Sequence, residues 1–402
     1  MANRQDIEIK KRQITILAAG HLATDLNQGA LPALLPFFIS TYGLSYTAAA
    51  AIVFAVNMSS SIIQPMFGLA ADRFAKPWLL PLGMMLGCLG LGLSGLCTSY
   101  PVLLVLGVIS GIGIAAYHPQ AARLVNLAAG DRKNTAMSFF GVGGTIGFAV
   151  GPLIASTAVV HWGLPGTLVL LIPATIMSIV VISQFSLFEE LEAAGARLKN
   201  AASAVVLKEN WSAFARIGAM VSLRSIVFFG LNIFIPIYWI KVFGQSHLAG
   251  AVALSIFSGS GIVGNITGGN LADRYGQRRV VIIGFLGLSI LLPLFVAMDS
   301  LVAATILLIP LGAVIFVTYS PTIVLGQRYL PGRVGLSSGV TIGLAVAVGG
   351  GAAPLIGKLA DIYGVWTAFS SLTPLPVLIF LIALTLPAPA SEEVRIIETK
   401  NI

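Results

Sequence analysis

Two ionisable side chains of opposite sign, Asp25 and Arg224, stand inside long apolar stretches, while the other fourteen acids fall in expected tails or loops. His21, Asp25 and Gln28 follow at i, i+4 and i+7, on one face of a helix with about 3.6 residues per turn. An acid inside an apolar stretch is costly and is a functional candidate by default. Because histidine exchanges protons readily, this face predicts a proton-coupling site.

His118 is a third candidate and stands immediately before Pro119 in a different apolar stretch. A histidine at such a place relays protons or donates to an anion, although an embedded histidine is also a common hydrogen-bonded helix contact. Two interpretations of the acid therefore remain open. Asp25 carries a transported proton that His21 and His118 tune or relay, or it is a structural acid satisfied by His21, His118 or Arg224.

Arg224 is the only lysine or arginine that falls inside an expected membrane helix. A guanidinium group binds a carboxylate or a phosphonate through two parallel hydrogen bonds. Phe228 and Tyr238 lie on the same helix face, with Asn232 toward its edge, and form an apolar lining with a few hydrogen-bonding groups. We predict an anion-binding site at Arg224. The alternative is a permanent ion pair between Arg224 and Asp25.

The composition indicates that these residues are carried by membrane-spanning helices. The chain has 402 residues, of which 57% are hydrophobic and 9% are charged, and its formal net charge is +8. Soluble domains carry about 25% charged residues. The composition therefore excludes a soluble globular enzyme, a disordered chain and an ordinary secreted domain. Apolar runs of about 20 residues recur, and each is long enough to cross a bilayer as a helix.

We predict an all-α integral membrane protein with twelve transmembrane helices in two six-helix parallel repeats. The helices are expected near residues 13–40, 46–70, 78–98, 101–122, 134–160, 165–186, 217–240, 249–271, 280–298, 301–326, 335–357 and 365–387. Twenty lysines and arginines fall on one side of the membrane and two on the other, so both termini are expected to be cytoplasmic. The basic charge then reflects topology and some attraction to anionic lipid, and indicates no nucleic-acid partner.

Four landmarks recur at an offset of 201 or 202 residues, half the length of the chain. Residues 68–73 return as 269–274, residues 117–119 as 319–321, Pro152 as Pro354 and Gly163 as Gly364. Parallel repeats are typical of carriers whose halves move about a site at mid-membrane. The expected parts are an N-terminal six-helix bundle over residues 1–186, a cytoplasmic linker over 187–210 and a C-terminal six-helix bundle over 211–402.

The repeated loop segments hold residues suited to a conformational lock. Asp72 and Asp273 stand at the cytoplasmic ends of their helices and are followed by Arg73 and Arg274. A carboxylate there can cap a neighbouring helix and pair with an arginine across the seam between the halves. The alternative is a turn in which glycine and aspartate only end a helix. The candidate lock residues are Gly68, Asp72, Arg73, Gly269, Asp273 and Arg274.

Gly143, Gly147 and Gly151 lie four residues apart in the fifth expected helix and are followed by Pro152. Small residues at this spacing let two helix backbones approach closely in lipid. We therefore predict a helix-packing stripe along these residues.

Several segments resemble known transporters. Residues 269–279, GNLADRYGQRR, resemble the loop motif of the major facilitator superfamily, whose first copy here lacks one glycine and one basic residue. Residues 147–152 are similar to the superfamily motif associated with proton-coupled exporters. Residues 21–37 and 117–123 resemble the fosmidomycin-resistance family.

The resemblance implies a carrier of the bacterial plasma membrane that works by proton-coupled alternating access, with its first, fourth, seventh and tenth helices lining the cavity. Tyr117 and Tyr319 then join Gln28 and Arg224 as candidate substrate contacts. By resemblance the protein is a drug-resistance antiporter that performs efflux of a small anionic compound, such as fosmidomycin or a related metabolite, in exchange for protons. The alternative is a proton symporter that imports an anionic metabolite.

Motifs for other functions are absent from the sequence. The chain contains no GxxxxGKS or GxxxxGKT nucleotide loop, no HExxH motif and no CxxC motif. We therefore expect no cofactor, no metal and no enzymatic activity. The expected partners are a small molecule, protons and membrane lipid, and the expected oligomeric state is a monomer.

Overall fold

The computed structural model describes residues 10–74, 77–129, 133–199, 209–330, 337 and 339–388. Within these residues the chain is helical and contains no strand. Eleven of the described helices are long and apolar enough to cross a membrane. α1 (Lys11–Tyr42) adds a further helix of 32 residues, whose buried positions include the polar residues His21, Asp25 and Asn27. The prediction of an all-α membrane protein is confirmed.

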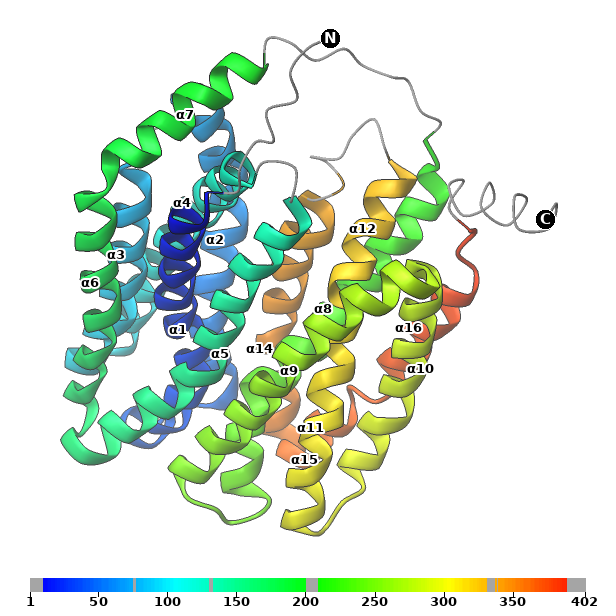
Figure 1. Ribbon diagram of the computed structural model, residues 1–402. Coiled ribbons are helices and arrows are strands. Elements are labelled where there is room, and N and C mark those ends of the chain that lie inside the picture. The colour runs from blue at the N-terminus through cyan, green and yellow to red at the C-terminus, as the bar shows by residue number, and fades with distance from the viewer. Residues whose placement is uncertain are drawn as a thin grey trace, which may run out of the picture. The chain divides into compact units, whose positions relative to one another are not determined.

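The first half of the chain follows the expected order of six spans (Figure 1). After α1 come α2 (Tyr46–Phe74), α3 (Leu79–Gly92) with the 3-10 segment η1 (Leu93–Leu96), α4 (Tyr100–Ala128), α5 (Lys133–Trp162), the 3-10 segment η2 (Leu164–Leu170) and α6 (Leu171–Ser183). The second half contains α8 (Trp211–Lys241), α9 (His247–Tyr275), α10 (Gln277–Val296), α11 (Leu301–Val317), α12 (Tyr319–Tyr329), the π-helix η4 (Gly339–Leu344), α14 (Ala345–Tyr363), α15 (Val365–Ser370) and α16 (Pro374–Leu384).

Two spans expected to be continuous are interrupted. The span expected near 301–326 breaks at Thr318, between α11 and α12, and the span expected near 365–387 is interrupted between α15 and α16. A proline lies beside each interruption, and its nitrogen has no hydrogen to donate to the preceding turn. Pro321 follows the first break, and Pro374 is the first residue of α16.

The polar segment expected as a linker begins as a helix, α7 (Phe185–Lys199), and residues 200–208 lie outside the described residues. Glu192 of α7 is buried, and its Oε1 accepts hydrogen bonds from Nε2 of Gln120 at 2.6 Å and from Nη1 of Arg123 at 2.9 Å. The expectation that every acid except Asp25 lies in a tail or loop is therefore wrong. Glu192 is buried because α7 packs this side against α4, and Asp273 and Asp361 are residues of α9 and α14.

The helices form two compact units. Unit 1 comprises Met1–Leu44, Ala48–Ala204 and Ser246–Ser255, and unit 2 comprises Ser45–Thr47, Val205–Gln245 and Ile256–Ile402. In unit 1, α1 packs chiefly against α5, and α3 packs against α4 and α6. In unit 2, α8 packs against α14 and α16, and α10 packs against α11 and α16.

The glycine stripe of α5 lies against α1. A Cβ atom at Gly143 or Gly151 would overlap the carbonyl oxygens of Ala18 and Leu26, respectively, and one at Gly147 would lie 2.5 Å from that of Leu22. Backbone atoms cannot swing aside as a side chain can, so any larger residue would push the two helices apart. The stripe thus permits the close approach that places the α1 side chains against α5.

The two units repeat one helix contact at the offset of 201 residues. A Cβ atom at Gly111 of α4 would overlap Oγ of Ser59 and the Val56 carbonyl oxygen on α2. Gly312 of α11 stands in the same relation to Oγ of Ser260 and the Phe257 carbonyl oxygen on α9. Positive φ angles recur at the same offset: Gly43 pairs with Gly244, and Gly163 pairs with Gly364. The repeat read from the sequence is thus also present in backbone conformation and packing.

Candidate functional site

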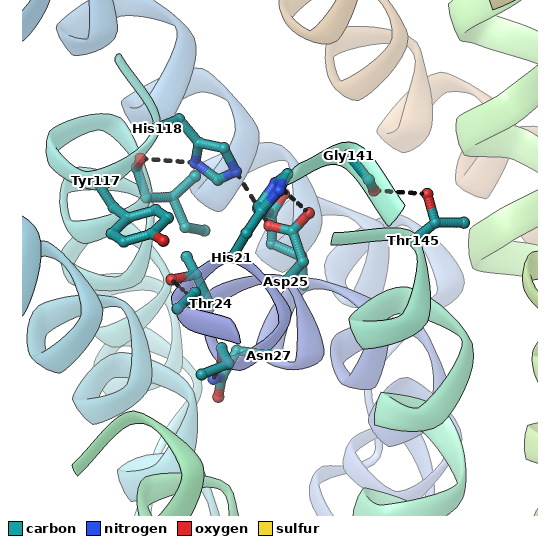
Figure 2. A network of polar contacts seen from close by, with 12 residues as sticks. His21, Thr24, Asp25, Asn27, Tyr117, His118, Gly141 and Thr145 are labelled. Atoms are coloured by element: carbon teal, nitrogen blue, oxygen red, sulfur yellow. Dashed lines mark hydrogen bonds and ion pairs between the residues drawn. The ribbon is translucent and has the colours of Figure 1, made fainter. Parts of the chain in front are cut away.

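Helices α1 and α4 of unit 1 bring His21, Asp25 and His118 together (Figure 2). The Asp25 carboxylate contacts both imidazole rings, which also meet edge to face with ring centroids 5.0 Å apart. Its Oδ2 is 3.1 Å from Nε2 of His21, and its Oδ1 is 3.1 Å from Nε2 of His118. Asp25 is only 6% exposed and His21 only 9%, so these polar contacts are made in the protein interior, where they are electrostatically stronger than in water.

The second nitrogen of each ring contacts the backbone. Nδ1 of His21 is 2.8 Å from the carbonyl oxygen of Phe140 in α5, and Nδ1 of His118 is 2.9 Å from that of Ile114 in α4. A carbonyl oxygen only accepts hydrogen bonds, so each Nδ1 carries a hydrogen and donates it. Each ring is thereby held with its Nε2 toward Asp25. The Phe140 ring also stacks on His21, with ring centroids 4.1 Å apart.

Gln28 and Gly144 complete the surroundings of the carboxylate. Nε2 of Gln28 donates to Oδ1 of Asp25 at 3.0 Å. A Cβ atom at Gly144 in α5 would lie 2.5 Å from Oδ2 of Asp25 and 2.6 Å from Nε2 of His21, so glycine leaves the room that the cluster occupies. The sequence offered a weak signal for Gly144, as the neighbour of Gly143 in the stripe. It offered none for Phe140, whose carbonyl group is common to every residue.

The same three side chains are also compatible with a metal ion. Their donor atoms lie within 4.8 Å of one another, and no second group of this kind occurs in the described ranges. Imidazole nitrogen and carboxylate oxygen are donors that zinc accepts. Here, however, each Nε2 lies at hydrogen-bond distance from a different oxygen of Asp25. This is the arrangement of two N–H···O hydrogen bonds, and we assign both contacts to protons.

In unit 2, Arg224 of α8 reaches the break between α11 and α12. Its Nε and Nη2 both donate to the carbonyl oxygen of Ile315, at 3.2 and 2.8 Å, and Nε is also 3.3 Å from Oγ1 of Thr318. Arg224 is 6% exposed. The interrupted helix thus supplies polar groups that hold a buried cation in a fixed orientation.

The opposite edge of this guanidinium group, formed by Nη1 and the outer hydrogen of Nη2, has no hydrogen-bond or carboxylate partner among the described residues. The Tyr319 ring lies on one face of the group, with its centroid 5.0 Å from Cζ. One turn further along α8, Phe228 contacts the edge of Phe316, with centroids 5.5 Å apart. The arrangement is a fixed cation with one free edge beside aromatic rings, and that edge matches the two oxygens of a carboxylate or phosphonate.

Three other candidate substrate contacts are buried. Tyr117 is 1% exposed, and its hydroxyl group donates to the carbonyl oxygen of Leu17 at 2.8 Å. Tyr238 is equally buried and packs on Phe369, with ring centroids 4.8 Å apart. Asn232 is buried as well, and its Nδ2 has no partner among the described residues. Tyr117 and Tyr238 therefore make contacts that hold helices together.

The sequence model of the Major Facilitator Superfamily matches residues 17–341. The chain belongs to this superfamily. It is 28% identical over 351 residues to the fosmidomycin resistance protein of Escherichia coli (strain K12), covering 86% of this chain and 85% of that protein. It is 30% identical over 383 residues to the uncharacterized MFS-type transporter YfnC of Bacillus subtilis (strain 168), covering 93% of this chain and 92% of that one.

Solved structures of other transporters share the superfamily fold. A bacterial homolog of the human lysosomal transporter Spinster, in its inward-facing and occupied conformation, matches with a TM-score of 0.76 and 14% identity, over 94% of this chain and 96% of that chain. The nucleoside transporter NupG matches with a TM-score of 0.73 and 14% identity, over 94% and 99%. The expected family is confirmed, and this superfamily member is a multi-pass membrane transporter and not an enzyme.

The superfamily loop motif is described in its second copy, at the end of α9. Asp273 and Arg274 are exposed, and Cζ of Arg274 lies 5.2 Å from the centroid of the Tyr275 ring. Gly276, with φ of 89°, joins α9 to α10 in a conformation that glycine adopts without strain. Gly269 lies within α9. The side chains of the first copy, Gly68, Asp72 and Arg73, lie outside the described residues, which give only the helical backbone of α2 there.

Proposed function

We propose that the protein exports a small anionic compound, such as fosmidomycin or a related metabolite, in exchange for protons and by alternating access. The name of the E. coli relative supports this substrate class. We place the protein in the bacterial inner membrane with both termini in the cytoplasm, which the one-sided distribution of lysine and arginine supports.

The observation that supports the proposal is the edge of Arg224 that has no hydrogen-bond or carboxylate partner in the described part of the chain. A buried guanidinium group without a carboxylate partner is costly, because its charge has left water without a compensating charge. An anionic substrate would supply that charge by binding to Nη1 and Nη2, while Ile315 and Thr318 keep the opposite edge in place. Tyr319 lies against Arg224, and Phe228 is one turn further along α8, so both are candidates to contact the body of such a substrate. Gln28 and Asn232 remain further candidate contacts.

Proton coupling is assigned to Asp25, with His21 and His118 as the groups that tune or relay the proton. Two imidazole groups that share one buried carboxylate are suited to this role, because gain or loss of a proton changes every contact in the cluster. The anion site in unit 2 and the proton site in unit 1 then supply the two binding events that an exchanger must couple.

Alternating access also needs contacts that hold one state and release in the other. We assign this role to the two loop-motif copies, Gly68, Asp72 and Arg73 with Gly269, Asp273 and Arg274. Charged groups at exposed helix ends suit such a contact, because they form and lose ion pairs at little cost. We expect the carrier to work as a monomer.

The test is transport of radiolabelled fosmidomycin into proteoliposomes under imposed pH gradients of either sign. Arg224→Lys keeps the charge but cannot bind both Ile315 and an anion through a planar fork. We expect the apparent affinity to fall roughly ten- to a hundredfold, since a hydrogen bond to a charged group contributes about 1.5–3 kcal/mol. Arg224→Gln is expected to abolish saturable uptake.

A matched control is Arg278→Lys. Nε and Nη2 of Arg278 also donate to backbone carbonyl oxygens, those of Leu386 and Leu384, but at the end of α10. Unchanged affinity in Arg224→Lys, or a preference of the wild-type protein for organic cations, would refute the anion site. The sign of the gradient decides direction: uptake driven by a proton gradient opposed to substrate movement supports exchange, and uptake driven along it supports the symport alternative.

A further inference from the structure

We infer that the closed cluster of His21, Asp25 and His118 holds two exchangeable protons, one in each contact with the carboxylate. The inference rests on the proposed role of this cluster in proton coupling, and it adds the number of protons. It follows from counting hydrogens and lone pairs at the atoms that face one another.

The first step is the hydrogen that each ring already uses. Nδ1 of His21 donates to Phe140, and Nδ1 of His118 donates to Ile114. A neutral imidazole has only one N–H, so in the neutral form of either ring Nε2 has a bare lone pair. This lone pair points at an oxygen of Asp25, which as a carboxylate also has only lone pairs.

The second step is the pair of contacts with Asp25. Both Nε2···O distances are 3.1 Å, and they involve different oxygens of the carboxylate. Two atoms with only lone pairs repel one another at this distance, so each contact needs its own hydrogen. One proton cannot serve both contacts, because each contact joins a different nitrogen to a different oxygen. The closed arrangement therefore contains two protons beyond the two at Nδ1.

The count does not depend on which atoms carry the protons. With both on Nε2, the cluster is two imidazolium groups and one carboxylate, with a net charge of +1. With one of them on Asp25, the acid donates to one ring and accepts from the other, and the total is unchanged. Release of both protons leaves two neutral rings and a carboxylate, with a net charge of −1. The two attractive contacts then become repulsive, and the cluster opens.

The neighbours of the cluster do not alter this count. Gln28 donates to Oδ1 of Asp25 through its amide group, which is neutral and does not gain or lose a proton. Gly144, on the α5 side, has no side chain. From α4, the Tyr117 hydroxyl group donates its hydrogen to the carbonyl oxygen of Leu17. In the described part of the chain, Asp25 has no ion-pair partner besides His21 and His118.

The test is nitrogen NMR of the full chain, labelled with 15N-histidine and held in lipid nanodiscs, through a pH titration. The sequence has four histidines, and His21→Gln and His118→Gln assign the two cluster signals. We expect both imidazoles to carry hydrogen on both nitrogens at the acidic end. Both should retain only the Nδ1 hydrogen at the alkaline end, although free histidine prefers hydrogen on Nε2. His161 is the internal control for a histidine outside the cluster. Its Nδ1 is also close to a carbonyl oxygen, that of Thr157 at 2.8 Å, but its ring is exposed.

A cluster imidazole that stays singly protonated throughout, or that retains hydrogen on Nε2 instead of Nδ1, would overturn the inference. This readout needs no substrate, so it stands even if fosmidomycin is not transported.

The transport arm measures the pH gradient that stops fosmidomycin flux against a tenfold concentration gradient, at zero membrane potential. Two protons per substrate predict about half a pH unit, and one proton predicts about one unit. We expect the two-proton value for wild type and His161→Gln, and the one-proton value for His21→Gln and His118→Gln.

Discussion

Gly144→Ala is the substitution that most directly tests the cluster. The new Cβ atom would lie 2.5 Å from Oδ2 of Asp25 and 2.6 Å from Nε2 of His21, against an ordinary contact distance of 3.4 Å or more. The Asp25 carboxylate and the His21 ring must therefore withdraw by about 0.8–0.9 Å. Withdrawal of the ring also strains its hydrogen bond to the Phe140 carbonyl oxygen, so the ring and the carboxylate do not move together.

The size of the effect follows from this displacement. The contact between His21 and Asp25, now 3.1 Å, would lengthen to about 4 Å and cease to be a hydrogen bond. Loss of a hydrogen bond between charged groups costs about 1.5–3 kcal/mol, or roughly ten- to a hundredfold in the population of the closed, proton-loaded cluster. Helix propensity acts in the opposite direction, because alanine is favoured over glycine by up to about 1 kcal/mol. The fold should therefore be nearly as stable as wild type.

The assay is fosmidomycin transport in proteoliposomes under an imposed pH gradient, beside thermal unfolding of the same preparations. Gly141→Ala is the matched control, since it lies on the same helix and a Cβ atom there meets nothing within 4 Å. We expect proton-driven transport to fall at least about tenfold in Gly144→Ala and to remain near wild type in Gly141→Ala. Equal transport in the two variants, at equal stability, would refute the packing of the cluster against α5.

Three further substitutions probe contacts around the sites. Gly151→Ala should destabilise unit 1 by about 1–3 kcal/mol, because its Cβ meets α1 backbone; thermal unfolding measures this, and an unchanged midpoint contradicts it. Glu192→Gln removes the charge that Arg123 binds and should cost about 1 kcal/mol, whereas the exposed Glu190→Gln should cost nothing measurable. Tyr117→Phe should lower stability by about 1 kcal/mol without changing fosmidomycin affinity; a weakened affinity would restore Tyr117 as a substrate contact.

The helices were predictable because hydrophobic length alone dictates them, and most described spans begin and end close to the expected residues. The interruptions were harder to predict. Proline occurs inside both continuous and broken helices: α4 continues through Pro119, whereas the span with Pro321 breaks at Thr318. The carbonyl of Ile315, beside that break, accepts two hydrogen bonds from Arg224. Such a tertiary contact has no signature in local sequence.

The contacts of the site within one helix were predictable from the sequence, and those between helices were not. His21, Asp25 and Gln28 share a helix, so their spacing predicted a common face, and the structure has Asp25 in contact with both neighbours. The approach of His118 and the closeness of Gly144 depend on how α4 and α5 pack against α1, which spacing does not contain. The family resemblance suggested Tyr117 as a substrate contact, and the structure adds a hydrogen bond from its hydroxyl group to the carbonyl oxygen of Leu17, which local sequence does not contain.

The two repeats differ in the buried charges that their first helices carry. α1 and α8 are equivalent, since each is followed within three residues by a glycine with φ of 63°, Gly43 and Gly244, at an offset of 201. At that offset, Asp25 corresponds to Ile226, and Arg224 corresponds to Ala23. Each of the two equivalent helices thus carries one buried charge. The two charges have opposite signs, and their positions differ by two residues once the offset of 201 is applied. In the proposed mechanism, these exchanges are part of what gives one unit the proton site and the other the anion site.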